Sequence, residues 1–455
     1  MNDGCIEGVS RRGLLGGMAA SLLLGPLGAG RALARSREED SLVVDAGSIS
    51  GRCHPRFSRV RDEFVRNFTD RGEVGASVTV IIDGETVVDL WGGIARTDTD
   101  APWEADTVTN VWSCTKGATA LCAHILAARG ALDLDAPVVE YWPEFGQQSK
   151  DTITVAMLLS HQAGLPAVRT PLPPDALFDW DLMVQSLAAE APFWEPGTRN
   201  GYHALTFGFL VGEVVRRVSG RSLGTFFRDE VATPLGLDFW IGLPEDQEPR
   251  VAPQIPADSF GEDGGVPIFY ATAFADPTSI PGLILFNSGG YLNPGAADTR
   301  AAHAAEIGAS GAITNARGLA GMYASLATRR PSHRFLDQDT VTRMGRVASA
   351  TGQDATILLP SRFAAGYVKS IDNRWMTPGN RDSVILAEEA FGHLGFGGGI
   401  GFADPRAGMG FGYSMNKMGG GLALNVRGQS LIDAVYESLG YTSDVAGSWV
   451  PRSIG

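Results

Sequence analysis

The chain carries strand patterns near both ends and helix patterns between them. In residues 75–91 two apolar runs flank Asp83-Gly84, and an Asp-Gly pair in that position predicts a β-hairpin. Near the other end, residues 398–416 contain two segments with strand-like alternation. Helical segments and proline-rich loops fill residues 132–347. This order predicts a mixed α/β (α+β) fold with one lobe formed by both chain ends, an inserted helical lobe, and a site between them.

The remaining patterns place further elements along the chain. Apolar periodicity predicts helices over 60–67, 155–159, 205–219, 318–327 and 428–438, and a strand over 362–369. Residues 244–295 are rich in glycine and proline and are expected to be irregular, as a border of the site or a lid. We therefore assign 35–130 and 348–455 to a sheet lobe, and 131–347 to a helical lobe.

The first residues form a pattern typical of a targeting segment. Arg11-Arg12 precede an apolar run that ends at Leu27, and the small-x-small sequence of residues 32–34 follows. This pattern predicts a twin-arginine export signal over residues 1–34, and hence a periplasmic, cell-wall or extracellular protein without stable membrane insertion after cleavage.

Composition and charge restrict the partners. The chain is 44% hydrophobic and 19% charged, which is typical of a globular protein with a large core, and its net charge is −14. An acidic surface argues against nucleic acid as a partner. The seven histidines and four cysteines show no metal-ligand spacing, so we expect neither a metal nor another cofactor. Cys114 and Cys122 would lie about 12 Å apart on one helix, too far for a disulfide.

An S-x-x-K sequence places a lysine one helical turn from a serine, where it can take up the hydroxyl proton. Roughly one or two such matches arise by chance in a chain of this length. Ser113 and Lys116 begin a segment that predicts a buried helix, whereas Ser414 and Lys417 lie on a strand pattern that ends in three glycines. We therefore predict Ser113 as a nucleophile and Lys116 as its partner.

Two other segments carry residues suited to the same chemistry. A turn-rich loop delivers Tyr202 to the start of a helix, where a tyrosine of lowered pKa beside a lysine can act as a general base; a half-buried structural aromatic is the alternative. The glycine-rich strand from His393 to Phe396 allows close approach of a ligand, and a backbone N–H there can complete an oxyanion hole with that of Ser113. The alternative is a bulged strand in which His393 caps a neighbour. We interpret His161 as structural.

Taken in order, these motifs resemble the serine β-lactamase and penicillin-binding-protein superfamily, in particular its class C-like branch with the family VIII carboxylesterases. The shared motifs are S-x-x-K, L-L-S-H-x-x-G-L-P, P-G-x-x-x-x-Y and G-H-x-G. The resemblance implies a β-lactamase-like antiparallel sheet flanked by helices. It implies Ser113 as the acylated residue, Lys116 and Tyr202 as a shared base, and the Phe396 N–H beside His393 and Gly395 as the second oxyanion donor.

Two departures from that family's usual pattern affect the expected substrate. Ala204 replaces the asparagine of Y-x-N, and His393-Leu394 replaces the lysine and threonine of K-T-G. A histidine near its reference pKa of about 6.5 is mostly neutral, so an anionic β-lactam loses its attracting charge. We expect a small ester or acyl substrate and a serine carboxylesterase. A β-lactamase, a D-amino-acid peptidase, an acyltransferase and a non-catalytic binding protein remain as alternatives.

Overall fold

The computed structural model describes residues 42–44, 47–443 and 447–452 of the chain. The export signal expected over residues 1–34 lies outside these described residues. None of the helices within them has the length and apolar character needed to cross a membrane.

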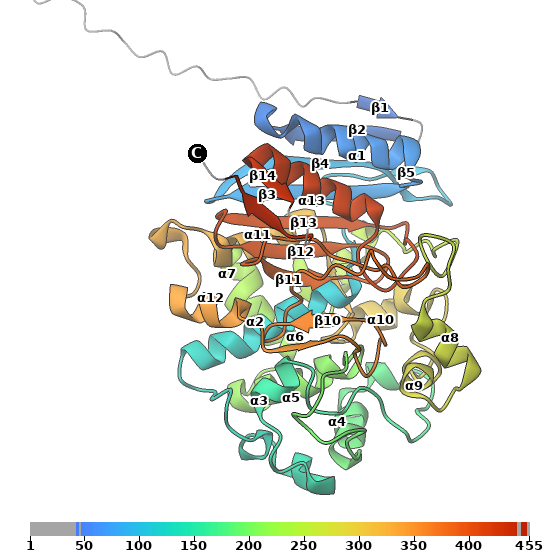
Figure 1. Cartoon of the computed structure of the whole chain (residues 1–455), viewed down its shortest axis with the longest axis vertical. Coiled ribbons are helices and arrows are strands. Elements are labelled where there is room, and N and C mark those ends of the chain that lie inside the picture. Colours follow the sequence, from blue (N-terminus) through green and yellow to red (C-terminus); the bar gives the residue numbers. More distant parts are fainter. Residues whose placement is uncertain (1–41, 45–46, 444–446, 453–455) are drawn as a thin grey trace, which may run out of the picture. The chain divides into compact units, whose positions relative to one another are not determined.

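An antiparallel sheet forms the upper part of the protein in Figure 1. Its strand order is β1-β2-β4-β3-β13-β12-β11, and β5 pairs with β4. Strands from both ends of the chain therefore share one sheet, because β3 pairs with β13. The strands are β1 (Leu42–Val44), β2 (Gly47–Cys53), β3 (Gly75–Ile82), β4 (Glu85–Arg96), β5 (Ala101–Pro102), β11 (Phe391–Leu394), β12 (Ile400–Asp404) and β13 (Met409–Met415). The expected mixed α/β fold with an antiparallel sheet is confirmed.

The turn between β3 and β4 explains why the Asp-Gly pair predicts this hairpin. Asp83 and Gly84 have φ of 47° and 84°, in the left-handed region that a tight two-residue hairpin turn requires. Asp83 also accepts a hydrogen bond from the Arg329 N–H at 2.9 Å, which joins the turn to the end of a helix.

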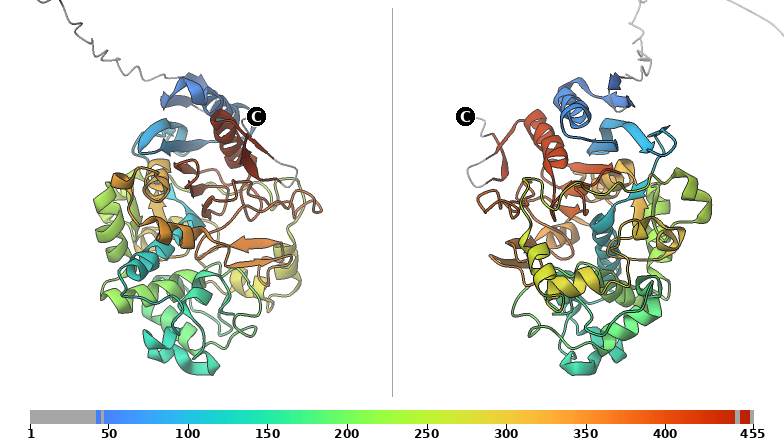
Figure 2. Two further views of the ribbon diagram at one scale, coloured as in Figure 1. Left: turned by 60° about the vertical axis from the view of Figure 1, so that its left-hand side comes forward. Right: turned by 90° about the vertical axis from the view of Figure 1, so that its right-hand side faces the viewer.

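Helices cover both faces of the sheet (Figure 2). Helices α1 (Ser58–Asp70) and α13 (Val426–Leu439) pack together over one face, and α11 (Ala316–Ala327) covers the other. A Cβ at Gly410 or Gly412 would lie 2.3 Å from the backbone of α11, so these glycines allow the helix to lie close to β13. Because α11 lies within 131–347, the boundary expected at residue 348 falls after a helix that packs on the sheet.

The helical region surrounds α2 (Thr115–Ala128), which is buried from Thr115 to Leu126 and packs against α5 and α6. A small antiparallel sheet of β6 (Thr109–Asn110), β8 (Ala312–Thr314) and β7 (Phe239–Ile241) leads into this region. The other helices are α3 (Val155–Leu159), α4 (Trp180–Ala189), α5 (Thr206–Ser219), α6 (Leu223–Phe227), α7 (Thr233–Leu235), α10 (Arg300–Ala304) and α12 (Gln338–Gly345).

Two segments differ from the sequence predictions. Residues 244–295 are not wholly irregular, because they contain the short helices α8 (Ile268–Ala275) and α9 (Ile280–Phe286). Both helices are apolar on most sides and so lack a helical period. The strand predicted over 362–369 is also interrupted, since β10 (Ser361–Phe363), which pairs with β9 (Ser349–Thr351), ends before Gly366 turns the chain at φ 90°. A last pair, β14 (Tyr441–Ser443) and β15 (Trp449–Pro451), follows α13.

Candidate active site

Ser113 lies in a single 3₁₀ turn, Trp112–Cys114, that leads directly into α2. The Asn110 side chain accepts a hydrogen bond from the Trp112 N–H at 2.8 Å, and the Cys114 N–H donates to the Val111 carbonyl at 3.1 Å. These bonds fix the turn, while Ser113 itself is half-buried and lines a cavity. The N–H of Ser113 has no hydrogen-bond partner among the described residues.

Lys116 lies one turn further along α2 and is fully buried. Its Nζ is 3.1 Å from Ser113 Oγ and donates to the carbonyl oxygens of Ala204 at 2.7 Å and Ala309 at 2.9 Å. Burial lowers the pKa of Lys116 well below its ordinary value, so the neutral amine is favoured. A neutral amine has two N–H groups and one lone pair. Since the two carbonyls accept the N–H groups, the lone pair is free for the Ser113 hydroxyl.

Tyr202 packs directly above the lysine. Nζ of Lys116 lies 4.7 Å from the centre of the Tyr202 ring, and the phenol contacts the Ser113 hydroxyl. Removal from bulk water raises the pKa of Tyr202, and the hydrogen bond with Ser113 only partly opposes this. This direction is opposite to the lowered tyrosine pKa considered from the sequence, because burial disfavours the phenolate. Burial thus favours the uncharged form of both groups at the serine.

A buried carboxylate that sequence reasoning missed holds the Tyr202 segment. Asp354 is fully buried and accepts hydrogen bonds from the Tyr202 N–H at 3.0 Å, the Thr356 N–H at 2.8 Å and the Ser361 hydroxyl at 2.9 Å. Burial raises the pKa of Asp354 and these hydrogen bonds lower it. The available signal was an Asx-turn pattern at Asp354-x-Thr356, which is common in loops and carries no chemistry by itself.

His161 supports the same tyrosine from below. Its ring lies edge-on to Tyr202 with centroids 5.0 Å apart, and its Nδ1 accepts a hydrogen bond from the His203 N–H at 3.1 Å. Burial lowers its pKa well below the ordinary value, so the ring is neutral. Phe363 stacks on Tyr202 from another side at 5.9 Å. These rings fix the tyrosine without contributing a charge.

The glycine-rich strand forms the opposite wall. A Cβ at Gly395 would lie 2.4 Å from the Val111 carbonyl oxygen, so only glycine lets this strand reach the turn that holds Ser113. The next N–H, that of Phe396, has no hydrogen-bond partner among the described residues. Two unpaired N–H groups, those of Ser113 and Phe396, therefore lie on segments that touch each other.

His393 lies on β11 and is 1% exposed. Its Nδ1–H donates to the Leu394 carbonyl at 2.8 Å, and its Nε2 has no partner among the described residues. Burial is the largest cause that lowers its pKa, to about 3. The histidine is therefore neutral at ordinary pH and carries no charge that could attract a carboxylate.

These groups open onto a cavity of about 590 Å³ whose wall is mostly apolar. Among the described residues that line it, Arg362 is the one lysine or arginine, and its two Nη atoms both donate to the Glu388 carboxylate. The lining includes the following apolar residues: Leu205, Phe269, Tyr270, Ile284, Leu292 and Phe396. The described residues contain no group of three or more His, Cys, Asp or Glu side chains suited to a metal.

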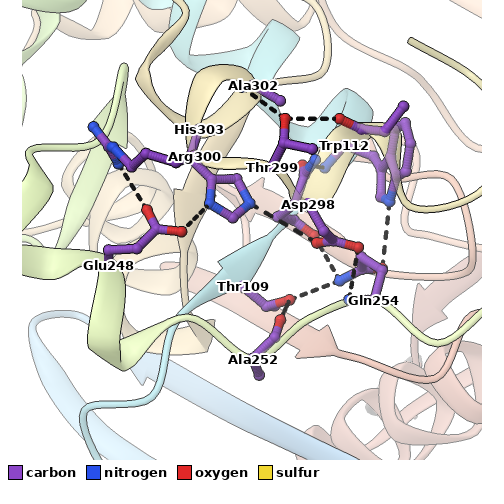
Figure 3. A network of polar contacts seen from close by, with 12 residues as sticks. Thr109, Trp112, Glu248, Ala252, Gln254, Asp298, Thr299, Arg300, Ala302 and His303 are labelled. Atoms are coloured by element: carbon purple, nitrogen blue, oxygen red, sulfur yellow. Dashed lines mark hydrogen bonds and ion pairs between the residues drawn. The ribbon is translucent and has the colours of Figure 1, made fainter. Parts of the chain in front are cut away.

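A second polar network lies behind Trp112 (Figure 3). The Trp112 indole N–H donates to Gln254 at 3.3 Å, and the Gln254 backbone N–H donates to Asp298 at 3.0 Å. Asp298 lies 3.8 Å from Nε2 of His303, whose Nδ1 is 2.8 Å from Glu248. Burial opposes protonation of His303, but the two carboxylates outweigh it and raise its pKa. Nothing in the sequence spacing of these residues indicates that they meet.

Comparison with known sequences gives one family. The profile of the family described as Beta-lactamase matches residues 61–435, most of the chain. An esterase/beta-lactamase, LipL of Mycobacterium tuberculosis, is 36% identical over 390 residues, which are 84% of this chain and 86% of that protein.

Solved structures give the same result. The crystal structure of a family VIII carboxylesterase has 38% sequence identity and a TM-score of 0.73, and covers 86% of this chain and 99% of its own. EstA from Arthrobacter nitroguajacolicus Rue61a has 32% identity and the same TM-score of 0.73, with 88% and 98% of the two chains covered.

Proposed function

Because the chain belongs to the Beta-lactamase family, we propose that it is a serine ester hydrolase that forms its acyl-enzyme on Ser113. One observation carries the proposal: the buried Lys116 Nζ lies 3.1 Å from Oγ of Ser113, which lines an apolar cavity. LipL is described as an esterase/beta-lactamase and one solved relative is a family VIII carboxylesterase, which supports this substrate class.

In the acylation step, Ser113 Oγ attacks the ester carbonyl carbon. The hydroxyl proton passes to the lone pair of the neutral Lys116 amine, whose two N–H groups are already bonded to carbonyls. A positioned general base of this kind contributes about 10²–10⁴ in rate. The N–H groups of Ser113 and Phe396 stabilise the negative charge on the former carbonyl oxygen, and each such donor is worth about 10²–10³ in kcat.

Collapse of the tetrahedral intermediate breaks the ester C–O bond. The leaving alkoxide takes a proton from the Tyr202 phenol, and the Lys116 ammonium returns its proton to the tyrosine. Both groups are thereby neutral again, in the state that burial favours. Water then attacks the acyl carbon, gives one proton to Lys116, and releases the carboxylic acid and free Ser113 by the reverse route.

The polar groups around the serine favour an uncharged ester over a β-lactam. The position that holds an amide in Y-x-N is Ala204, whose backbone oxygen bonds Lys116. His393 is neutral, and the cavity's Arg362 is paired with Glu388. A substrate carboxylate thus has no free cation to meet among the described lining residues, and its desolvation would be uncompensated.

Purified protein tests this directly. We expect hydrolysis of p-nitrophenyl butyrate, covalent labelling by a fluorophosphonate, and loss of both in Ser113→Ala by at least about 10⁴-fold. Ser414→Ala is the matched control and should keep its activity. Faster turnover of a chromogenic cephalosporin than of the ester would favour a β-lactamase instead, and undiminished activity in Ser113→Ala would exclude the assigned nucleophile.

A further inference from the structure

Exposed large apolar side chains concentrate in one segment beside the cavity. Of eight such side chains among the described residues, five lie between residues 260 and 286, each 38–53% exposed. They are Phe260, Val266, Ile268, Phe274 and Phe286. We call these five side chains the α8–α9 face. Clustering of this kind on a soluble protein indicates a binding surface, because scattered single exposures are the ordinary case.

The face is continuous with the cavity that holds Ser113. The Phe286 and Phe274 rings are 5.8 Å apart, Phe274 and Phe260 are 5.7 Å apart, and Phe260 and Tyr270 are 5.0 Å apart. Phe260 and Tyr270 both line the cavity. Aromatic side chains therefore form an unbroken path from solvent to the substrate cavity.

The side of α8 and α9 opposite the exposed residues is packed inside the protein. Phe269, Tyr270 and Ile284 are buried and pack in one cluster with Phe396 and Ala204, beside the nucleophile. In Figure 1, α8 and α9 project at the right-hand margin of the described region. Ile268, Phe274 and Phe286 thus lie on the exposed side of helices whose other side is buried, so burying these three side chains takes a partner from outside.

The charges of the segment decide which partner fits. From residue 251 to residue 299 the chain contains no lysine, arginine or histidine. The same stretch carries five acidic residues: Asp258, Glu262, Asp263, Asp276 and Asp298, of which Asp258 pairs with Lys417 and Asp263 lies 3.9 Å from Arg381. Interfacial segments that bind anionic lipids are rich in lysine and arginine, which is the opposite pattern.

We propose that the α8–α9 face docks on the surface of aggregated, uncharged, water-insoluble esters and guides an acyl chain over Phe260 to Ser113. The inference rests on the proposed ester hydrolase function and specifies its substrate as an ester surface rather than single dissolved molecules. Docking buries the exposed phenylalanines, and the neutral ester surface does not repel the acidic side chains around them.

Tributyrin tests the proposal, because its solubility limit separates dissolved from emulsified ester in one titration. We expect the rate of the full chain to rise sharply as tributyrin passes that limit. The double variant Phe274→Ser/Phe286→Ser should lose the rise and bind the emulsion about 25-fold more weakly, at about fivefold per half-exposed phenylalanine. Neither residue lines the cavity, so hydrolysis of dissolved p-nitrophenyl acetate should stay unchanged.

Val450→Ser, an exposed apolar position on β15, is the matched control and should retain the rise. The proposal would be overturned if the wild-type rate did not rise at the solubility limit of tributyrin, or if the double variant kept that rise. Tighter binding to phosphatidylglycerol vesicles than to the emulsion would also overturn it. So would a wild-type dimer that becomes monomeric in the double variant, since the face would then be a self-association surface. Failure to hydrolyse dissolved p-nitrophenyl acetate would instead contradict the ester hydrolase function itself.

Discussion

The two S-x-x-K sequences of this chain have the same spacing and opposite surroundings. Ser113 and Lys116 lie on a helical start, where Nζ is buried within 3.1 Å of Oγ. Ser414 lies on β13 and bonds Ser77 at 2.9 Å, while Lys417 turns away and pairs with Asp258 at 2.8 Å. Nζ of Lys417 is bonded to Asp258 and to the Pro256 carbonyl, and it has no contact with Ser414. The comparison shows that backbone conformation and desolvation make the catalytic pair, and spacing alone does not.

The largest expected difference in activity between the two S-x-x-K pairs comes from removing the lysine amine of each pair in turn. Lys116→Met keeps the buried stem but deletes the group that takes the Ser113 proton, so kcat for p-nitrophenyl butyrate should fall by about 10³-fold. Lys417→Met should change kcat less than about twofold, because it breaks only a partly exposed ion pair. Similar losses in the two variants would remove the distinction between the pairs.

Asp354 should matter less, because it acts only through Tyr202. Asp354→Asn keeps the volume but turns a strong acceptor into a weaker one, so we expect kcat to fall about tenfold with KM nearly unchanged. Asp404, an equally enclosed carboxylate that accepts from Tyr436 at 2.9 Å, supplies the control. Asp404→Asn should lower the melting temperature but leave kcat alone. A kcat loss shared by both variants would point to general destabilisation.

The smallest expected effect is a pH-dependent change in the free energy of unfolding, caused by the polar network behind Trp112. Because the folded-state pKa of His303 is raised, its charged form stabilises the fold below about pH 6.5, and this contribution disappears as pH rises through the folded pKa. His303→Gln should therefore unfold in urea about 1–2 kcal/mol more easily than wild type near pH 6, with the gap shrinking toward pH 8.5. If the difference in unfolding free energy between wild type and His303→Gln grew with pH, a stabilising charge on His303 would be contradicted.

Much of the fold could be predicted, because local signals coincide with tertiary structure. The Asp83-Gly84 turn follows from turn chemistry, and α3 and α5 follow from their apolar residues, which are buried in the fold. Helices α8 and α9 could not be predicted in this way. Their apolar residues point both to the core and to solvent, so no periodicity distinguishes the two sides.

The candidate site was likewise predictable from the sequence only in part. Ser113, Lys116, Tyr202 and Gly395 meet as the motifs predict. The protonation states did not follow from the motifs, because the raised pKa of Tyr202 depends on burial by segments distant in sequence. Asp354 was missed for a related reason: it is 152 residues from the tyrosine whose N–H it binds.

The contact between Gly395 and Val111 has a consequence for protein engineering. The side chains of His393 and Leu394 line the cavity, so exchanging them is expected to alter which substrates are accepted. At position 395 even a methyl group would meet a carbonyl oxygen at 2.4 Å. A library built on this strand should therefore randomise the first two positions and leave the third untouched.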